Sequence, residues 1–404
     1  MPARKQPTAA ITRQSIDLLP SVRELPDPFA FLDGSRVMRV EEWPRRRAEL
    51  AALVQAYQYG HLPPAPAAGA VKAEAAPDYA PPSRSGSNAD TQPTTRPDPT
   101  CPPGASQEKY RLVVTAPSGK RVTFPLVVTV PRGDGPFGVI VRGDLCWGPA
   151  KAPIAVEVAR RGYILAEFDR TGIVPDKAVG RDVGAYAAYP DLDFGALAAW
   201  AWGYGRVIDY VLTRRDVDGS RIVVTGHSRG GKTALLAGAM DERVALTVPN
   251  NSGCGGAGCY RFQADKSEDI AAITGRFAFW FHARFGDFIG KVDRLPVDQH
   301  SVKALVAPRA LLTTEALGDL WANPAGTLHT HLAAREVFAF LGAADRIAIH
   351  FRPGKHEQNL YDWQTLLEYA DGLFRQKPTT RKYDQDPFPQ SPPTWSWRAP
   401  GSPR

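Results

Sequence analysis

Hydrophobic residues recur along this chain at two different spacings. Short apolar runs rich in Val, Ile, Leu and Phe predict β-strands at Tyr110–Thr115, Arg121–Val130, Phe137–Arg142, Tyr163–Asp169, Arg221–Thr225, Val244–Val248, Ala310–Thr314 and Arg346–Phe351. Apolar residues three or four positions apart predict helices at Ile154–Arg161, Phe194–Leu212, Lys232–Ala239, Leu328–Leu341 and Tyr361–Arg375. Two antiparallel-looking strands followed by alternating strands and helices favour the α/β class. We expect a mainly parallel central sheet flanked by helices, a three-layer sandwich.

The segments outside this region differ from it in composition. A helical pattern over Glu41–Gly60 precedes a stretch of many prolines, alanines and serines, which we expect to be disordered or loosely laid. Trp395 and Trp397 indicate that part of the Pro-rich end of the chain packs. We therefore expect four parts: an N-terminal wrap with one helix (1–61), a low-complexity insertion (62–106), the main α/β domain (107–376) and a C-terminal tail (377–404).

Composition and charge exclude several classes of protein. Of 404 residues, 43% are hydrophobic and 23% charged, which is ordinary for a globular protein and rules out a fully disordered chain. The formal net charge is +7, but the basic residues are scattered, with Arg45–Arg47 the densest cluster, so we do not expect nucleic-acid binding. No apolar run approaches the ~20 residues of a membrane-spanning helix. The first residues, Met1–Lys5, carry charge without the apolar stretch of a signal peptide.

Four cysteines are too few for a disulfide scaffold in a chain of this length. Cys254 and Cys259 lie five residues apart, and no second pair of Cys or His stands at zinc spacing. A local disulfide or two buried thiols is the expected arrangement. We therefore predict no metal site and no cofactor.

One motif carries specific chemistry. Gly226-His227-Ser228-Arg229-Gly230 stands between a predicted strand and a predicted helix. This is the G-x-S-x-G pattern of a nucleophile elbow, in which a sharp turn lifts the serine hydroxyl above the sheet. The helix start behind the serine favours a developing negative charge. We predict Ser228 as a nucleophile; the alternative is a Gly/Ser turn without chemical meaning.

A nucleophilic serine needs a neighbouring base. α/β-Hydrolases carry the nucleophile, the acid and the histidine in that chain order, and His356 directly follows the last predicted strand, where this histidine belongs. His227 adjoins the serine and is expected to point away from it. The remaining candidates lie on a predicted helix or strand, where packing or solvent exposure is the ordinary role, namely His329, His331 and His350.

The acid of the triad is expected after the penultimate strand. Asp319 is the first candidate and Glu315 the second. Its carboxylate would hold the imidazole of His356 in the correct tautomer and stabilise its charged form. The alternative for Asp319 is a carboxylate that only caps a loop.

Several further stretches resemble the glucuronoyl esterase family, carbohydrate esterases of the α/β-hydrolase fold, in a bacterial-type form. The matching stretches are Gly195–Gly203, Gly226–Lys232, Asn250–Gly256, Leu295–His300, Ala304–Arg309, Asp319–Gly326, His356 with Tyr361–Trp363, Trp43–Arg47 and Tyr59–Pro64. They cover nearly the whole chain apart from the insertion and the tail. The resemblance implies cleavage of the ester between (4-O-methyl-)glucuronic acid of glucuronoxylan and a lignin alcohol.

The resemblance also implies roles for individual residues. Ser228 and His356 match the family's nucleophile and base, and Arg229 matches the arginine that stabilises the oxyanion. Lys232 matches a lysine that binds sugar hydroxyls, Trp321 a tryptophan that lines the uronate site, and Gln263 a sugar-binding glutamine. A cation beside a developing oxyanion lowers the barrier selectively, because the charge exists only in the transition state.

The chain departs from the family at four places. Many members carry the acid as a Glu after the strand that follows the nucleophile helix, where this chain has Asn250 or Asn251; other members use the later loop, which favours Asp319. Fungal members have Cys in place of His227, so the associated disulfide is absent. The family's sugar-binding Glu, expected within 273–279, has no counterpart, and Arg276 is the nearest charged residue. Gln263 matches only a loose alignment.

We therefore predict a cofactor-free serine carboxylester hydrolase that acts on a uronic-acid ester of a plant polysaccharide as a monomer. The resemblance implies a secreted or periplasmic protein. An acetylxylan or other carbohydrate esterase is the first alternative, and a non-catalytic carbohydrate-binding pseudoenzyme is the second.

Overall fold

The computed structural model describes residues 14–82, 101–391 and 393–401. One nine-stranded sheet runs through it in the order β1-β2-β3-β5-β4-β6-β7-β8-β9. The strands are β1 Val71–Ala75, β2 Ser106–Thr115, β3 Arg121–Val130, β4 Phe137–Arg142, β5 Tyr163–Phe168, β6 Val217–His227, β7 Leu246–Asn250, β8 Ala310–Ala316 and β9 Ile347–Arg352. Antiparallel pairing joins β1, β2, β3 and β5, and parallel pairing joins all strands from β5 to β9. The mainly parallel sheet predicted from the sequence is therefore confirmed.

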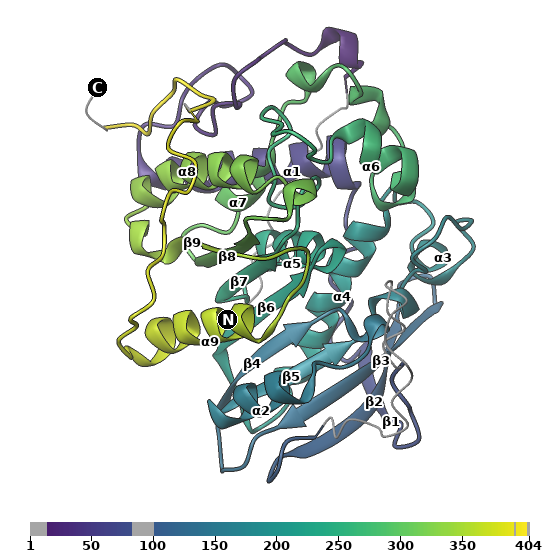
Figure 1. Ribbon diagram of the computed structural model, residues 1–404. Helices are drawn as coiled ribbons and strands as arrows, with labels where there is room; N and C mark the ends of the chain where they lie inside the picture. The colour runs from purple at the N-terminus through teal and green to yellow at the C-terminus, as the bar shows by residue number, and fades with distance from the viewer. Residues whose placement is uncertain (1–13, 83–100, 392, 402–404) are drawn as a thin grey trace.

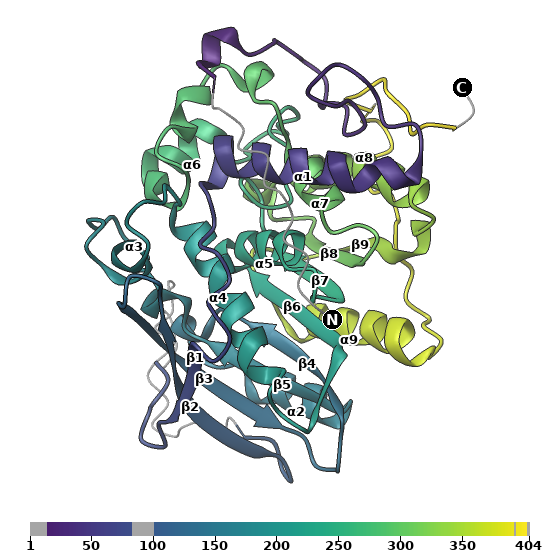
Figure 2. The same ribbon diagram turned by 180° about the vertical axis from the view of Figure 1, so that it is seen from behind.

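Helices cover both faces of the sheet, as the two ribbon views show (Figures 1 and 2). Two helices, α2 (Ala152–Arg160) and α9 (Leu360–Arg375), lie on one face. The other face carries α1 (Trp43–Val54), α4 (Ala196–Val211), α5 (Arg229–Met240), α7 (Gln299–Ala304) and α8 (Pro324–Phe340). Two short helices, α3 (Gly184–Ala188) and α6 (Ile270–Phe277), lie in connections between these elements.

The period-two pattern of the strands explains why two hydrophobic layers form. In β6, Ile222 and Val224 belong to the apolar layer on the α4 and α5 side, whereas Val223 belongs to the layer beneath α2 and α9. Successive side chains of a strand point to opposite faces, so a continuous apolar run is buried on both. Central parallel strands of this kind bring their carboxyl ends to one edge of the sheet.

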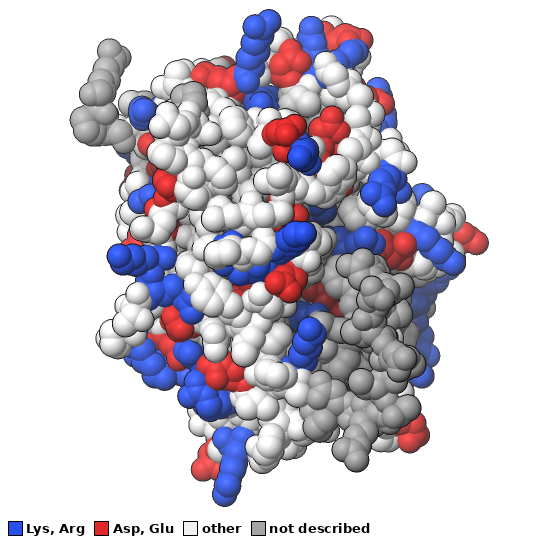
Figure 3. Space-filling model, viewed as in Figure 1, with Lys and Arg blue, Asp and Glu red and all other residues white. Residues whose placement is uncertain are grey.

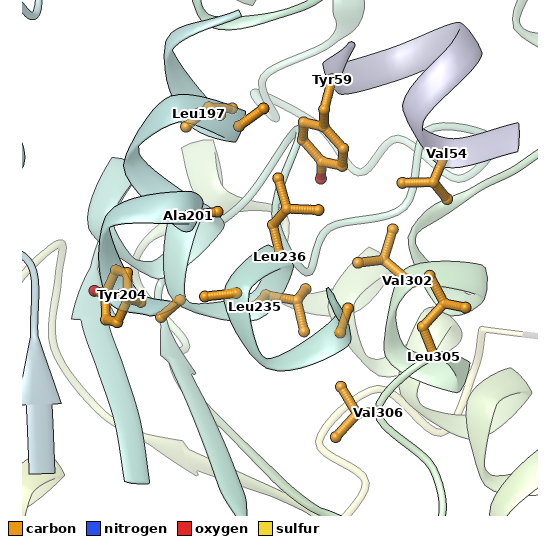
Figure 4. Close-up of a cluster of buried hydrophobic side chains, with 14 of the residues drawn as sticks. Val54, Tyr59, Leu197, Ala201, Tyr204, Leu235, Leu236, Val302, Leu305 and Val306 are labelled. Atoms are coloured by element: carbon orange, nitrogen blue, oxygen red, sulfur yellow. The ribbon is translucent and has the colours of Figure 1, made fainter. Parts of the chain in front are cut away.

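The N-terminal segment is part of the core. Figure 4 shows Val54 and Tyr59 facing Leu236 of α5 and Val302 of α7. The helix predicted over residues 41–60 is α1 followed by one π-helical turn, Gln55–Tyr59, and it ends at Gly60. At Gly60 φ is +81°, and a Cβ there would lie 2.4 Å from the Cα of Phe194, so glycine is required.

The segment 62–106 is more ordered than we expected. Strand β1 lies inside it and pairs with β2 along the edge of the sheet, from Val71 opposite Val114 to Ala75 opposite Tyr110. The error came from composition, because a five-residue strand on an edge needs few large apolar residues. Residues 83–100 of this segment lie outside the described part. The boundaries of the four-part division stay a prediction.

The Pro-rich tail packs in part, as its tryptophans indicated. Trp395 and Trp397 are buried, and the indole N–H of Trp397 donates to the carbonyl of Leu25 at 2.6 Å. Trp397 also stacks on His300, with ring centroids 5.8 Å apart. Both ends of the described chain therefore meet on the α7 and α8 side of the molecule.

Candidate active site

The nucleophile turn joins β6 to α5. Ser228 lies between these elements with φ +56° and ψ −121°, a conformation that is strained for any residue with a side chain. A Cβ on Gly226 would lie 2.4 Å from the Gly230 carbonyl oxygen, and a Cβ on Gly230 would lie 2.0 Å from Oδ1 of Asp144. Both glycines of the motif are therefore sterically required, and the turn presents the Ser228 hydroxyl at the edge of the sheet.

A buried carboxylate holds this turn from below. Asp144 follows β4, and its Oδ2 accepts the backbone N–H of His227 at 2.9 Å. Its Oδ1 accepts from the guanidinium of Arg170. Both Asp144 and Arg170 are fully buried, so this ion pair acts at low dielectric. The loop after β4 is thereby fixed against the nucleophile turn.

The structure brings Ser228, His356 and Asp319 together in one chain of hydrogen bonds. Nε2 of His356 lies 2.8 Å from Oγ of Ser228, and Nδ1 lies 2.5 Å from Oδ2 of Asp319. The Asp319 side chain is buried, whereas that of His356 is 44% exposed and reaches the pocket. The three residues come from the ends of β6, β8 and β9, which lie in the same half of the sheet.

The loop that carries His356 is fixed by backbone contacts. The N–H of Gly318 donates to the Gly354 carbonyl at 2.9 Å, which links the loops after β8 and β9. The guanidinium of Arg352 donates to the Glu357 carbonyl at 2.7 Å, and the amide of Asn251 donates to the same oxygen at 3.2 Å. Asn251, which cannot act as the acid, therefore helps to hold the loop of the base.

Glu315, the second candidate for the acid, lies elsewhere. Its side chain is fully buried, and desolvation together with the charge of Asp319 raises its pKa well above the usual range. The neighbouring ammonium of Lys303 is also buried, and desolvation lowers its pKa to about 7. Asp319, not Glu315, is the carboxylate that reaches the imidazole.

The ring of His227 packs against the base, and it is not among the residues that line the pocket. Its ring centroid is 4.6 Å from that of His356, and its Nδ1 lies 2.7 Å from Oδ1 of Asn250. The amide nitrogen of Asn250 donates to Thr314. The Oδ1 of Asn250 therefore accepts the hydrogen bond from the Nδ1–H of His227. Burial and the charge of His356 lower the pKa of His227 to about 4, so it packs as a neutral ring. The sequence placed it beside the serine but could not show which way the ring turns.

A pocket of about 180 Å³ opens beside the nucleophile. Its lining includes the predicted Ser228, Arg229, Lys232, Trp321 and His356, and it also includes Asn251, Glu268, Arg276, Phe277 and Trp280. Positive and negative side chains are interspersed over the face of the molecule in Figure 3, without a large patch of one sign. Because charged side chains and aromatic rings both line the pocket, it suits a small polar ligand with a flat apolar face.

Lys232 lies at the floor of this pocket. Its ammonium donates to the carbonyls of Ser252 and Cys254 at 2.6 and 2.5 Å, and it stands 3.6 Å from a carboxylate oxygen of Glu268. These acceptors explain a buried cation in the first turn of α5, where the helix dipole disfavours it. The backbone N–H of Glu268 donates to the carbonyl of Trp321, so two pocket residues are tied together.

Sequence reasoning missed Glu268, which lies in the charged run 265–269 and reads as solvent-exposed. Only the tertiary structure shows that Glu268 is buried and faces Lys232. Gln263 is not among the lining residues. Its amide nitrogen donates to the carbonyl of Cys259, and its oxygen accepts from Ser267. Cys254 and Cys259 are buried free thiols, one of the two arrangements expected.

The fold and this site define a serine carboxylic ester hydrolase of the α/β-hydrolase fold. The family described as fungal glucuronyl esterase matches residues 113–342. A carbohydrate esterase of an unknown prokaryotic organism is 30% identical over 86% of this chain and 89% of its own length. A 4-O-methyl-glucuronoyl methylesterase of Wolfiporia cocos is 32% identical over 80% of this chain and 73% of its own.

Solved structures agree. A glucuronoyl esterase of carbohydrate esterase family 15 from Caldicellulosiruptor kristjansonii is similar with a TM-score of 0.76 and 29% identity, covering 96% of this chain and all of the other. A promiscuous esterase of the same family from a marine bacterial metagenome is similar with a TM-score of 0.68 and 27% identity, covering 88% of this chain and 98% of the other. This chain belongs to the glucuronoyl esterase family, which confirms the resemblance drawn from its motifs.

Proposed function

We propose that this enzyme hydrolyses esters of (4-O-methyl-)glucuronic acid carried by a plant polysaccharide, with a lignin alcohol as leaving group. The observation that carries the proposal is the unbroken contact from Asp319 through His356 to Ser228 at the rim of a polar pocket. Relatives that are named 4-O-methyl-glucuronoyl methylesterases support the uronate ester as the substrate.

The proposed reaction proceeds through an acyl-enzyme. Nε2 of His356 takes the proton of Ser228 while Oγ attacks the uronoyl carbonyl carbon, and the imidazolium is stabilised by Asp319. The same proton then passes to the alcohol oxygen as the ester bond breaks. Water then gives a proton to Nε2 of His356 and attacks the acyl-enzyme; as the bond to Oγ breaks, the imidazolium returns that proton to Ser228 and the uronic acid leaves.

Arg229 is the proposed side-chain donor to the tetrahedral oxyanion, together with backbone N–H groups of the turn. It directly follows the nucleophile and lines the pocket. Removing one such donor typically costs ~10²–10³ in rate. Its positive charge acts mainly in the transition state, because only there does the carbonyl oxygen carry a full negative charge.

Lys232, Glu268 and Trp321 are the proposed contacts to the sugar ring. Two of the three N–H groups of Lys232 point to backbone carbonyls, which leaves the third between Glu268 and the pocket. A carboxylate can accept from the hydroxyl to which this ammonium donates. Trp321 is 46% exposed and can cover the apolar face of the ring.

Partners and location follow from the proposed substrate. A polymer of the plant cell wall is met outside the cell, so we infer secretion or export to the periplasm. Among the described residues, no helix combines the length and apolarity that crossing a bilayer requires. We propose that the protein acts as a monomer; the three proposed catalytic residues and the pocket lie on one chain, so the site needs no second copy.

The test compares benzyl glucuronate with 4-nitrophenyl acetate and acetylxylan, for the natural enzyme and for Ser228→Ala. We expect the highest kcat/KM on the glucuronate ester and loss of all three activities in the variant. A preference for acetyl esters would contradict the proposed substrate. Glucuronate binding that persists in Ser228→Ala, with no hydrolysis by the natural chain, would instead favour the carbohydrate-binding pseudoenzyme.

The alternative substrate class is another carbohydrate ester, such as acetylxylan. One observation favours it, namely the likeness to a family member described as promiscuous. The pocket opposes it, because Lys232 and Glu268 line the pocket and an acetyl group carries no hydroxyl for them to bind.

A further inference from the structure

A carboxylate outside the pocket holds the guanidinium beside the nucleophile. Nη1 of Arg229 donates to Oδ2 of Asp176 at 2.6 Å. The other oxygen of Asp176 accepts the indole N–H of Trp280 at 2.9 Å. Asp176 follows the turn Arg170–Gly172 and is not among the residues that line the pocket, whereas Arg229 and Trp280 are. Asp176 therefore contacts Arg229 from outside the pocket.

Three aromatic rings surround the same guanidinium. Its central carbon lies 4.8 Å from the ring centre of Trp280, 5.2 Å from that of Phe277 and 5.7 Å from that of Trp147. Phe277 and Trp280 stack with centroids 4.0 Å apart, so their ring planes form one rigid wall. Cation–π contacts of this kind contribute roughly 0.5–2 kcal/mol each.

Arg229 needs this support because of its place in the chain. It is the first residue of α5, where the helix dipole repels a cation, and an unrestrained arginine loses up to about 2 kcal/mol of side-chain entropy when it is fixed. Among the described residues, the Arg229 guanidinium donates to Asp176, and its Nε is buried without an acceptor. The Arg229 side chain is 28% exposed, so its guanidinium can still meet an acceptor that arrives with the substrate.

We propose that Asp176 is a positioning residue that orients the Arg229 guanidinium towards the oxyanion, with Trp280 as the donor that fixes Asp176. This inference rests on the proposed function, which gives Arg229 its role at the oxyanion. Asp176 contacts neither substrate nor reacting atoms. It acts by holding a donor before the reaction starts, which is how electrostatic preorganisation lowers a barrier.

Asp176 has a second, opposing effect. Its negative charge partly offsets the field of Arg229 at the oxyanion. If positioning dominates, removal of the charge lowers kcat; if charge compensation dominates, removal raises kcat. The direction in which kcat changes when the charge of Asp176 is removed therefore distinguishes the two effects.

The experiment measures kcat and KM on benzyl glucuronate for Asp176→Asn, Arg229→Ala and the double variant. Asparagine keeps the size of the side chain and can still accept from Trp280. We expect kcat to fall roughly tenfold in Asp176→Asn with KM within twofold, since orientation matters mainly in the transition state. In the Arg229→Ala background, Asp176→Asn should cause no further loss, because there is no guanidinium left to position.

Asp209→Asn is the matched control. Asp209 also accepts from two donors, Arg206 and Arg243, and is not among the pocket residues. The Asp209→Asn substitution removes the same charge and should leave kcat unchanged. Trp280→Phe is the second variant, since it removes one hydrogen bond to Asp176 and keeps a ring. We expect kcat to fall by about threefold, and the melting temperature of each variant shows that it is folded.

Several results would overturn the inference. An unchanged or higher kcat in Asp176→Asn would show that Asp176 does not position Arg229. An equal fall of kcat in both backgrounds would show that Asp176 acts through some other group. A natural level of activity in Arg229→Ala would contradict the proposed role of Arg229 itself, and that outcome is distinct from failure of Asp176 alone.

Discussion

Asp319 and Glu315 are four residues apart, and burial separates their chemistry. Asp319 reaches the edge of the sheet and contacts His356, whereas Glu315 belongs to β8 and is fully buried. Burial and the charge of Asp319 raise the pKa of Glu315, which disfavours the charged form that could stabilise an imidazolium. Two carboxyl groups of one short stretch therefore lie in different surroundings, and only that of Asp319 contacts the imidazole.

This difference predicts the behaviour of two isosteric variants. Asp319→Asn should lower kcat by roughly 10³–10⁴, because the amide cannot hold the correct tautomer of His356 or stabilise its charge. Glu315→Gln should change kcat less than fivefold, because Asp319 and not Glu315 contacts the imidazole of His356. Steady-state kinetics on benzyl glucuronate at pH 7 measures both. Near-natural activity of Asp319→Asn would show that another carboxylate serves.

The sequence could predict the residues that a chain-order rule governs. Ser228, His356 and Asp319 follow from the motif and from strands that end at one edge. Glu268 and Asp176 could not be found in this way, because each acts through a partner that only tertiary structure brings near. The contact of His227 with Asn250 of the neighbouring strand could not be found in this way either.

At the scale of elements, Arg47 of α1 joins three helices. Nε donates to the Leu305 carbonyl after α7, Nη2 donates to the Ala239 carbonyl in the last turn of α5, and Nη1 pairs with Glu242. Carbonyls at a helix end lack partners within their helix, so Arg47 supplies them. The N-terminal helix thereby supports the helix that carries the nucleophile.

Arg47→Met should therefore lower the free energy of unfolding by about 2 kcal/mol, since it leaves buried carbonyls without donors. The kcat of the folded variant should not change, because the nucleophile lies at the opposite end of α5. Urea denaturation and steady-state kinetics measure the two quantities. Arg160→Met, which removes an exposed ion pair with Glu157, should cost less than about 1 kcal/mol. Equal losses in the two variants would contradict the bridging role.

Apolar strands and long helices were predictable, whereas short helices and the polar edge strand were not. β3 and β4 have the predicted bounds, and α4 and α9 lie within two residues of them. The helices α3, α6 and α7 were not predicted, because five to eight residues make barely two helical turns, and β1 was not predicted, because it has few large apolar residues. These short elements form where the surrounding core selects them: Ile273 of α6 and Val302 of α7, for example, are fully buried.

At the scale of the whole molecule, burial makes stability depend on pH. His300 is buried, its Nε2 lies 2.8 Å from the Pro26 carbonyl, and desolvation lowers its pKa to about 4. The charged groups that act on it are Asp298, Arg261 and Lys303. Because the pKa of His300 is lower in the folded protein than in the unfolded chain, this histidine makes its whole contribution to stability at pH values above its usual pKa. That contribution is lost as pH falls from about 6.5 towards 4.

The natural enzyme should therefore lose stability on acidification, with His300 contributing on the order of 2 kcal/mol between pH 7 and pH 5. His300→Gln should flatten the plot of unfolding free energy against pH over that range, even if it lowers stability at pH 7. His61 gives the opposite sign: Asp193 raises its pKa, so it stabilises the fold at acidic pH. His61→Gln should therefore steepen the plot. An unchanged slope in His300→Gln would contradict the assignment.

The contact between Trp397 and Leu25 spans 372 positions of the chain. During synthesis, the ribosome must translate residues 26–396 before this indole exists. Until then Phe29 and His300 lack the ring of Trp397 as a partner, on a nascent chain whose proposed catalytic residues have all been made. This seam can therefore close only after nearly all of the described core has been synthesised.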